Sequence, residues 1–153
     1  MTKKTVKAIP DGMNCLTAYL TCDCASDAIA FYKKAFNAVE VSRIAGKDGK
    51  IMNAMIRIDD SGLMVMDEFP AMKALGPKSL KGSPVTIHMQ VADVDAVVKQ
   101  AVAAGATLHM PTADMFWGDR YAQLEDSFGH HWSVATHVRD VSPEEMQEAM
   151  AKM

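Results

Sequence analysis

The sequence has no long hydrophobic run, no basic run and few cysteines. No segment approaches the roughly 18 apolar residues that a membrane helix needs, and no apolar signal-peptide core follows the basic opening MTKKTVKAIPDG. The net charge of -3 argues against nucleic acid or an anionic membrane surface as the main partner. We therefore expect a cytoplasmic protein that binds neither nucleic acid nor membranes.

The cysteines also exclude a class of protein. Cys15, Cys22 and Cys24 are an odd number crowded into one strand-like segment, where a disulfide framework has nothing distant to join. Cys22 and Cys24 form a C-x-C without a second pair, which argues against a zinc knot. We expect reduced thiols that pack as small apolar side chains.

What the sequence does contain is an internal repeat. The segments 17–38 and 86–106 each have the pattern of a short alternating strand, a polar corner and an amphipathic helix. With a one-residue gap at the corner, Asn37 aligns with Gly105 at the end of the helix. Asn and Gly most readily take the left-handed conformation that ends a helix, which supports two copies of one unit.

Three strand-like runs follow each predicted helix, so both halves have the order strand, helix, strand, strand, strand. The runs are VEVSRIAG, KIMNAMIRID and GLMVMDE, then TLHM, RYAQLED and HHWSVATHV, with KDGK, DDSG and DSFG as turns and a long connection through PTADMFWGD. The modules then cover 14–68 and 85–139, with a Gly- and Pro-containing linker over 69–84. Ser142-Pro143-Glu144-Glu145 is a capping box that predicts a C-terminal helix over 142–152.

The motifs AIAFYKKAF and D-x-F-G-H-x-W, in this order within the tandem pattern, resemble the vicinal oxygen chelate superfamily of glyoxalases, bleomycin-resistance proteins and extradiol dioxygenases. The resemblance covers about residues 14–139. It is closer to the PhnB-like branch, where YL, FY..AF, GDR and FGH.W recur. It implies an α+β fold in which tandem βαβββ modules form an open, curved, eight-stranded sheet. This cup has its helices outside and its ligand inside, usually in a homodimer.

Enzymes of the superfamily hold a divalent metal in the cup with ligands from strands one, four, five and eight. The matching positions here are Thr17, Met66, Thr86 and Ser133. Hydroxyl and thioether groups are poor ligands for such a cation beside imidazole or carboxylate. The resemblance therefore implies that the inherited metal site is absent, and we expect no cofactor.

Strand alternation then assigns the side chains that face the cup. These are Thr17, Tyr19 and Thr21 in the first strand, Thr86, His88 and Gln90 in the fifth, and His131, Ser133, Ala135 and His137 in the last. Trp132 falls on the helix-facing side and is expected in the core. His130 is expected in the turn, with a local hydrogen bond.

Two further features bear on ligand recognition. In MFWGDRY, Trp117 lies near Arg120, and an aromatic ring beside a guanidinium suits a flat or anionic ligand. A structural Asp–Arg pair at the rim is the alternative. Met64 and Met66 either face the cup or fill the core. The predicted ligand-binding set is Thr17, Tyr19, Met66, Thr86, His88, Gln90, Trp117, Arg120, Ser133 and His137.

Three functions stay open at this point. The favoured one is a protein that binds a small, partly aromatic or amphipathic molecule in a metal-free polar cup. The second is an enzyme: a metal-dependent lyase, isomerase or dioxygenase with displaced ligands His88, His131 and Glu68, or a metal-free catalyst. In the latter, His88, or His131 with Tyr19, would act as general acid or base. The third is an interaction module with vestigial cups. The sequence does not decide whether the cups form within one chain or between swapped chains.

Overall fold

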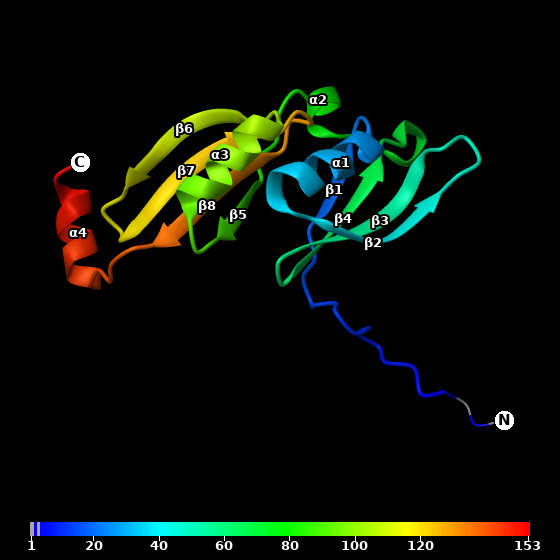
Figure 1. Ribbon diagram of the computed structural model, residues 1–153, viewed down its shortest axis with the longest axis horizontal. Coiled ribbons are helices and arrows are strands. Elements are labelled where there is room, and N and C mark those ends of the chain that lie inside the picture. Colours follow the sequence, from blue (N-terminus) through cyan, green and yellow to red (C-terminus); the bar gives the residue numbers. More distant parts are fainter. Residues whose placement is uncertain (1, 3) are drawn as a thin grey trace.

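The computed structural model describes residues 2 and 4–153, which form two four-stranded sheets with helices on one side (Figure 1). The strand orders are β1-β4-β3-β2 and β5-β8-β7-β6, and in each sheet the first strand runs parallel to the last. The predicted tandem βαβββ fold is confirmed. The first module contains β1 (Tyr19–Cys22), α1 (Ala25–Phe36), β2 (Val39–Ala45), β3 (Ile51–Ile58) and β4 (Ser61–Asp67). The second contains β5 (Thr86–Gln90), α3 (Val94–Ala104), β6 (Thr107–Asp114), β7 (Asp119–Glu125) and β8 (His131–His137).

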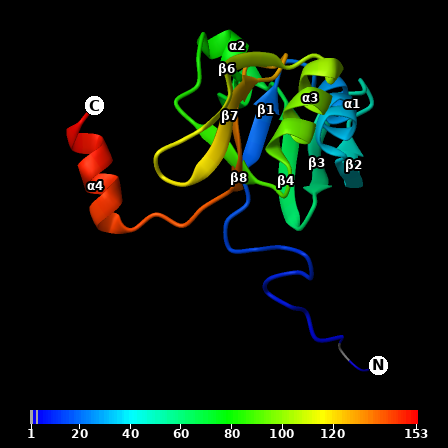
Figure 2. The same cartoon turned by 60° about the vertical axis from the view of Figure 1, so that its left-hand side comes forward.

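The helices α1 and α3 lie side by side and end as the repeat predicts (Figure 2). Asn37 ends α1 with φ 56°, and Gly105 ends α3 with φ 120°. The start of α3 is capped by Asp93, whose carboxylate accepts a hydrogen bond from the backbone N–H of Ala96. At the start of α1 the buried carboxylate of Asp67 accepts from the N–H of Ala25 at 2.7 Å.

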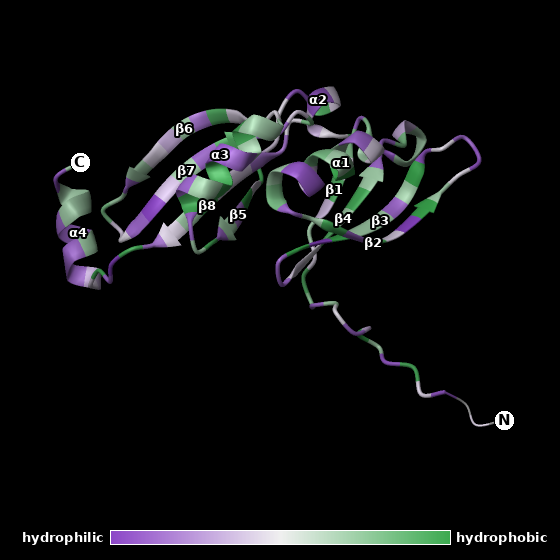
Figure 3. Cartoon of the chain, in the orientation of Figure 1, coloured by the Kyte–Doolittle hydropathy of each residue, from purple (hydrophilic) through white to green (hydrophobic). Residues whose placement is uncertain are grey.

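The two modules share one hydrophobic core on the helix-facing side of the sheets. Tyr32 and Phe36 of α1 contact Trp132 of β8, with ring centroids 5.5 and 4.8 Å apart. Trp132 is 1% exposed, which confirms its predicted place in the core. Hydrophobic and hydrophilic residues alternate along the strands in Figure 3. Successive side chains of a strand point to opposite faces, so one set packs against the helices and the other lies on the open face of the sheet.

Two strands begin or end at other residues than predicted. The strand expected from Thr17 begins at Tyr19. The run TLHM does not end before a long connection: β6 continues through PTAD to Asp114, and the loop is only 115–118. The strand continues past Pro111 because β6 is an edge strand with register shifts, where the missing N–H of a proline interrupts no ladder.

The segments outside the modules are short. The predicted linker contains a 3-10 turn, η1 (Pro70–Met72), and one helical turn, α2 (Pro77–Leu80). The C-terminal helix α4 (Pro143–Ala151) has the predicted capping box between Ser142 and Glu145. It lies apart from the sheets in Figure 1. Within the described residues, no helix is long and apolar enough to cross a membrane.

Candidate functional site

The open face of the second sheet carries a chain of hydrogen-bonded polar groups. His88 of β5 and Ser133 of β8 are partners in the parallel register, and His88 Nδ1 lies 2.8 Å from Ser133 Oγ. His88 Nε2 lies 3.0 Å from Gln90 Oε1. Because the amide oxygen only accepts, Nε2 donates to it, and in a neutral imidazole Nδ1 accepts from the Ser133 hydroxyl. The structure thus brings together three of the predicted ligand-binding residues.

Aromatic rings border this polar chain. The ring of Tyr121 in β7 is stacked on His88 with centroids 6.4 Å apart. Trp117 meets Tyr121 edge to face at 5.5 Å. Trp117 was singled out from the sequence, whereas Tyr121 was missed. The register could have found Tyr121, because it lies opposite Ala135 of β8, on the cup face beside Ser133. We call His88, Gln90, Ser133, Tyr121 and Trp117 the polar–aromatic patch.

Of the predicted ligand-binding residues in the first module, Tyr19 and Met66 lie on the other sheet, and Thr17 precedes β1. The hydroxyl of Tyr19 donates to Met52 O at 3.1 Å and accepts from Asn53 Nδ2 at 2.9 Å. Met66 is paired with Thr21 in the parallel register of β1 and β4. Tyr19 therefore makes its hydrogen bonds within the first sheet, while His131 belongs to the second. Within the described part of the chain, no hydrogen bond joins Tyr19 to His131, so the structure does not form the predicted acid–base pair of these two residues.

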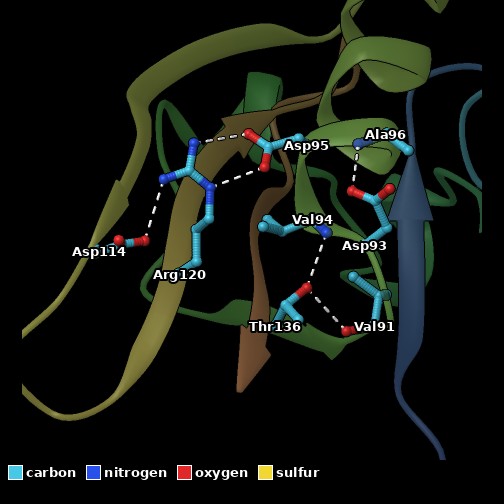
Figure 4. Close-up of polar contacts among 8 residues, drawn as sticks. All are labelled: Val91, Asp93, Val94, Asp95, Ala96, Asp114, Arg120 and Thr136. Atoms are coloured by element: carbon cyan, nitrogen blue, oxygen red, sulfur yellow. Dashed lines mark hydrogen bonds and ion pairs between the residues drawn. The ribbon is translucent and has the colours of Figure 1, made fainter. Parts of the chain in front are cut away.

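Arg120 lies on the helix-facing side of β7, where its side chain reaches Asp95 of α3 (Figure 4). Its register partner in β8 is Thr136, whose side chain points to the face opposite that of Ser133. Its guanidinium donates to both carboxylate oxygens of Asp95, at 2.8 and 3.0 Å, and to Asp114 at 3.1 Å. These hydrogen bonds raise the pKa of Arg120 and lower the pKa of Asp95. The contacts match the structural Asp–Arg alternative, although the partners are Asp95 and Asp114 rather than the adjacent Asp119.

The histidines near the end of the chain serve different contacts. His137 donates from Nδ1 to Asp119 and from Nε2 to Asp140, both at 2.8 Å. Hydrogen bonds from the imidazole to Asp140 and Asp119 raise the pKa of His137 above its usual value. His130 differs from the expectation of a purely local bond. Its Nε2 reaches the carbonyl of Thr21 at 2.9 Å and so connects the two modules.

The displaced metal ligands proposed from the sequence do not gather. Glu68 accepts from the N–H of Gly76 at 2.7 Å, and His88 is bonded within the polar–aromatic patch. Among the described residues, the one group with three candidate donors within 4.8 Å of one another is His109, Glu125 and His131. The sequence analysis assigned no site role to His109, although it lies within the expected strand TLHM.

A buried carboxylate also escaped the sequence analysis. Asp126 is 5% exposed and accepts four hydrogen bonds. Two come from the Tyr32 hydroxyl at 2.6 Å and the indole N–H of Trp132 at 2.9 Å. The others come from the backbone N–H groups of Phe128 and His130. Burial, and then the charge of Asp126, raise the pKa of Tyr32. Asp126 therefore fixes the DSFGH turn against α1.

Residues 16–134 match the model of the Glyoxalase/Bleomycin resistance protein/Dioxygenase superfamily. The chain belongs to this superfamily, as the resemblance of its motifs indicates. It is 48% identical over 139 residues to "Uncharacterized protein Mb0911c" of Mycobacterium bovis, covering 89% of this chain and 91% of that protein.

Solved structures show the same fold. TioX from Micromonospora sp. ML1 has a TM-score of 0.65 at 23% identity, covering 80% of this chain and 98% of that chain. A "Putative 3-demethylubiquinone-9 3-methyltransferase, PhnB protein" from Bacillus cereus has a TM-score of 0.64 at 16% identity, covering 80% of this chain and 99% of that chain. At these identities the likeness concerns the fold alone.

Proposed function

We propose that this protein is a PhnB-like binding protein that holds a small, partly aromatic organic molecule against the polar–aromatic patch. The observation that carries the proposal is the hydrogen bond between His88 and Ser133, whose residue is 3% exposed, together with the ring of Tyr121 stacked on His88. Groups already fixed by one another lose little conformational entropy when a ligand binds.

The chemistry of the patch indicates the kind of ligand. Tyr121 and Trp117 offer ring faces and edges to a flat apolar group, and such aromatic contacts contribute about 0.5–1.5 kcal/mol beyond the area they bury. Gln90 and His88 supply a polar end, since the amide of Gln90 has donors free of the contact with His88. A ligand with a flat ring and one neutral hydrogen-bonding group satisfies both.

Binding fits the patch better than acid–base catalysis by His88. Both ring nitrogens of His88 already have partners in the protein, Ser133 and Gln90. A general base needs a free nitrogen within reach of the substrate proton. The same contacts that prepare a binding surface therefore occupy the group that would transfer the proton.

We propose further that the protein works as a homodimer. Each cup would then combine the first sheet of one chain with the second sheet of its partner. β1 and β5 are edge strands of their own sheets. A groove of about 340 Å³ lies between residues 58–63 and 87–91. Exposed strand edges readily pair with another chain. Such pairing would set the first-module residues Thr17, Tyr19 and Met66 opposite the polar–aromatic patch of the partner. Light scattering on the purified protein measures the mass directly.

Ligand binding is tested with a panel of small heteroaromatic compounds, followed by the fluorescence of Trp117. The chain has two tryptophans, and Trp132 is buried in the core, so Trp132 provides a constant background. We expect saturable quenching that is weakened by Tyr121→Leu and Ser133→Ala. Arg120→Lys serves as the matched control, because Arg120 lies on the opposite face of the second sheet, where it contacts Asp95 of α3. Equal loss in the control, or no saturable quenching with any compound, contradicts the proposal.

A further inference from the structure

We propose that His109, Glu125 and His131 bind one divalent transition-metal ion on the open face of the second sheet. Each residue offers one donor atom, and the three atoms lie within 4.8 Å of one another. His109 Nε2 is already 3.0 Å from Glu125 Oε2. In a tetrahedral zinc site, bonds of about 2.0–2.1 Å place ligand atoms roughly 3.3 Å apart. Small side-chain rotations therefore close the group around an ion.

The backbone holds these donors in place. Glu125 and His131 are opposite partners in the antiparallel pair of β7 and β8, joined by the turn that Asp126 fixes. Their neighbours Leu124 and Trp132 are also partners and are buried in the core, so Glu125 and His131 face away from the helices. His109 stands in a register shift of β6, where the bulge brings its ring within 6.0 Å of the His131 ring.

This site is not the one that the superfamily uses. The positions that match the superfamily's ligands are Thr17 just before β1, Met66 in β4, Thr86 in β5 and Ser133 in β8. The proposed ligands come from β6, β7 and β8. Two imidazoles and one carboxylate suit zinc, iron(II) or cobalt(II), and three protein ligands leave coordination positions open. The metal ligands are not residues of the polar–aromatic patch, so metal binding here does not depend on an organic ligand at that patch.

The surroundings indicate what completes the coordination. Glu125 and His131 line a hollow of about 350 Å³ together with Lys78 and Lys81 of the α2 segment. Asp23 is 3.4 Å from Lys78 and balances one of these charges. With a divalent ion beside Glu125 the hollow keeps a net positive charge, which favours an anion as a further ligand. We therefore assign the open positions to a small oxyanion.

The metal test uses the full-length, tag-free protein, stripped with a chelator and titrated with zinc and with cobalt(II). We expect one ion per chain and the visible absorption of four- or five-coordinate cobalt. His109→Ala, Glu125→Gln and His131→Ala should each weaken binding by at least about 100-fold, since loss of an outer-shell partner alone costs 10–100-fold. His137→Gln is the control, because His137 lies at the other end of β8 and contacts Asp119 and Asp140.

Folding is checked without metal by circular dichroism and thermal unfolding. His109→Ala decides the matter, because its side chain is 42% exposed on an edge strand and its removal leaves the core intact. Binding that survives His109→Ala, or is lost equally in His137→Gln, overturns the metal site. Inorganic phosphate should change the cobalt spectrum, and less so in Lys81→Ala. An unchanged spectrum overturns the oxyanion assignment.

Discussion

The conservative substitution Asp126→Asn tests the central contact between the modules. The carboxylate accepts from four groups, so an amide cannot replace it without loss. If the amide oxygen serves the N–H groups of Phe128 and His130, its NH2 group faces the hydroxyl of Tyr32 and the indole of Trp132. The hydroxyl can turn and accept, but the indole N–H is only a donor.

The cost follows from these contacts. An unpaired buried donor costs about 1–3 kcal/mol, and two hydrogen bonds that lose their charged acceptor each weaken by roughly 1 kcal/mol. We expect Asp126→Asn to lower the free energy of unfolding by about 4 kcal/mol. For a chain of this size that corresponds to a fall of roughly 8–16 °C in Tm.

Urea unfolding followed by circular dichroism and by tryptophan fluorescence measures the loss. Asp23→Asn is the matched control, because Asp23 is at the surface and makes one loose contact with Lys78. Surface substitutions usually change stability by less than about 0.5 kcal/mol. A double-mutant cycle with Tyr32→Phe should show a coupling between the two positions. A loss under about 1 kcal/mol for Asp126→Asn would refute the assigned hydrogen-bond network.

Three further predictions concern single contacts. Thr136→Val removes the hydroxyl that accepts from Val94 N–H at 2.8 Å, and should cost about 1–3 kcal/mol in urea unfolding; an unchanged midpoint would contradict it. Asn37→Ala should destabilise by roughly 1 kcal/mol because φ is 56°, whereas Asn37→Gly should be nearly neutral in the same assay. The raised pKa of His137 means that its stabilising contribution is fully present below its usual value of 6.5 and is lost as the pH rises through the raised value. His137→Gln should flatten that part of the Tm–pH profile, and an identical profile would count against the contacts with its carboxylates.

Much of the fold could be predicted from the sequence, because strand alternation and helix-ending residues depend only on neighbouring positions in the chain. Alternation along the strands separates Trp132 from its cup-facing neighbours, and the register of β5 and β8 agrees with it. The ends of the helices were also predictable, since Asn37 and Gly105 supply the left-handed conformation. The full length of β6 was not predicted: the expected strand stopped at Met110, but a proline is tolerated at an edge, and β6 continues past Pro111.

The residues of the candidate sites could be predicted from the sequence less well than the fold. Tyr121 and Glu125 could have been placed from the turn DSFG, since an antiparallel hairpin fixes which residues face each other. His109 could not, because its position depends on a bulge in β6 that shifts the register against β7. The partners of Arg120 could not be predicted from the sequence either. Asp95 is 25 residues away and contacts Arg120 only because α3 packs on the second sheet.

The sequence by itself determined the superfamily and the repeated βαβββ order, because both depend on residue types at fixed spacings. The tertiary structure decided which distant groups meet. It placed Asp126 beneath both Tyr32 and Trp132, directed Arg120 away from the cup and gathered His109 with Glu125 and His131. These contacts depend on how strands and helices pack on one another, within the second module as well as between the two modules, and such packing leaves no periodic signal in the sequence.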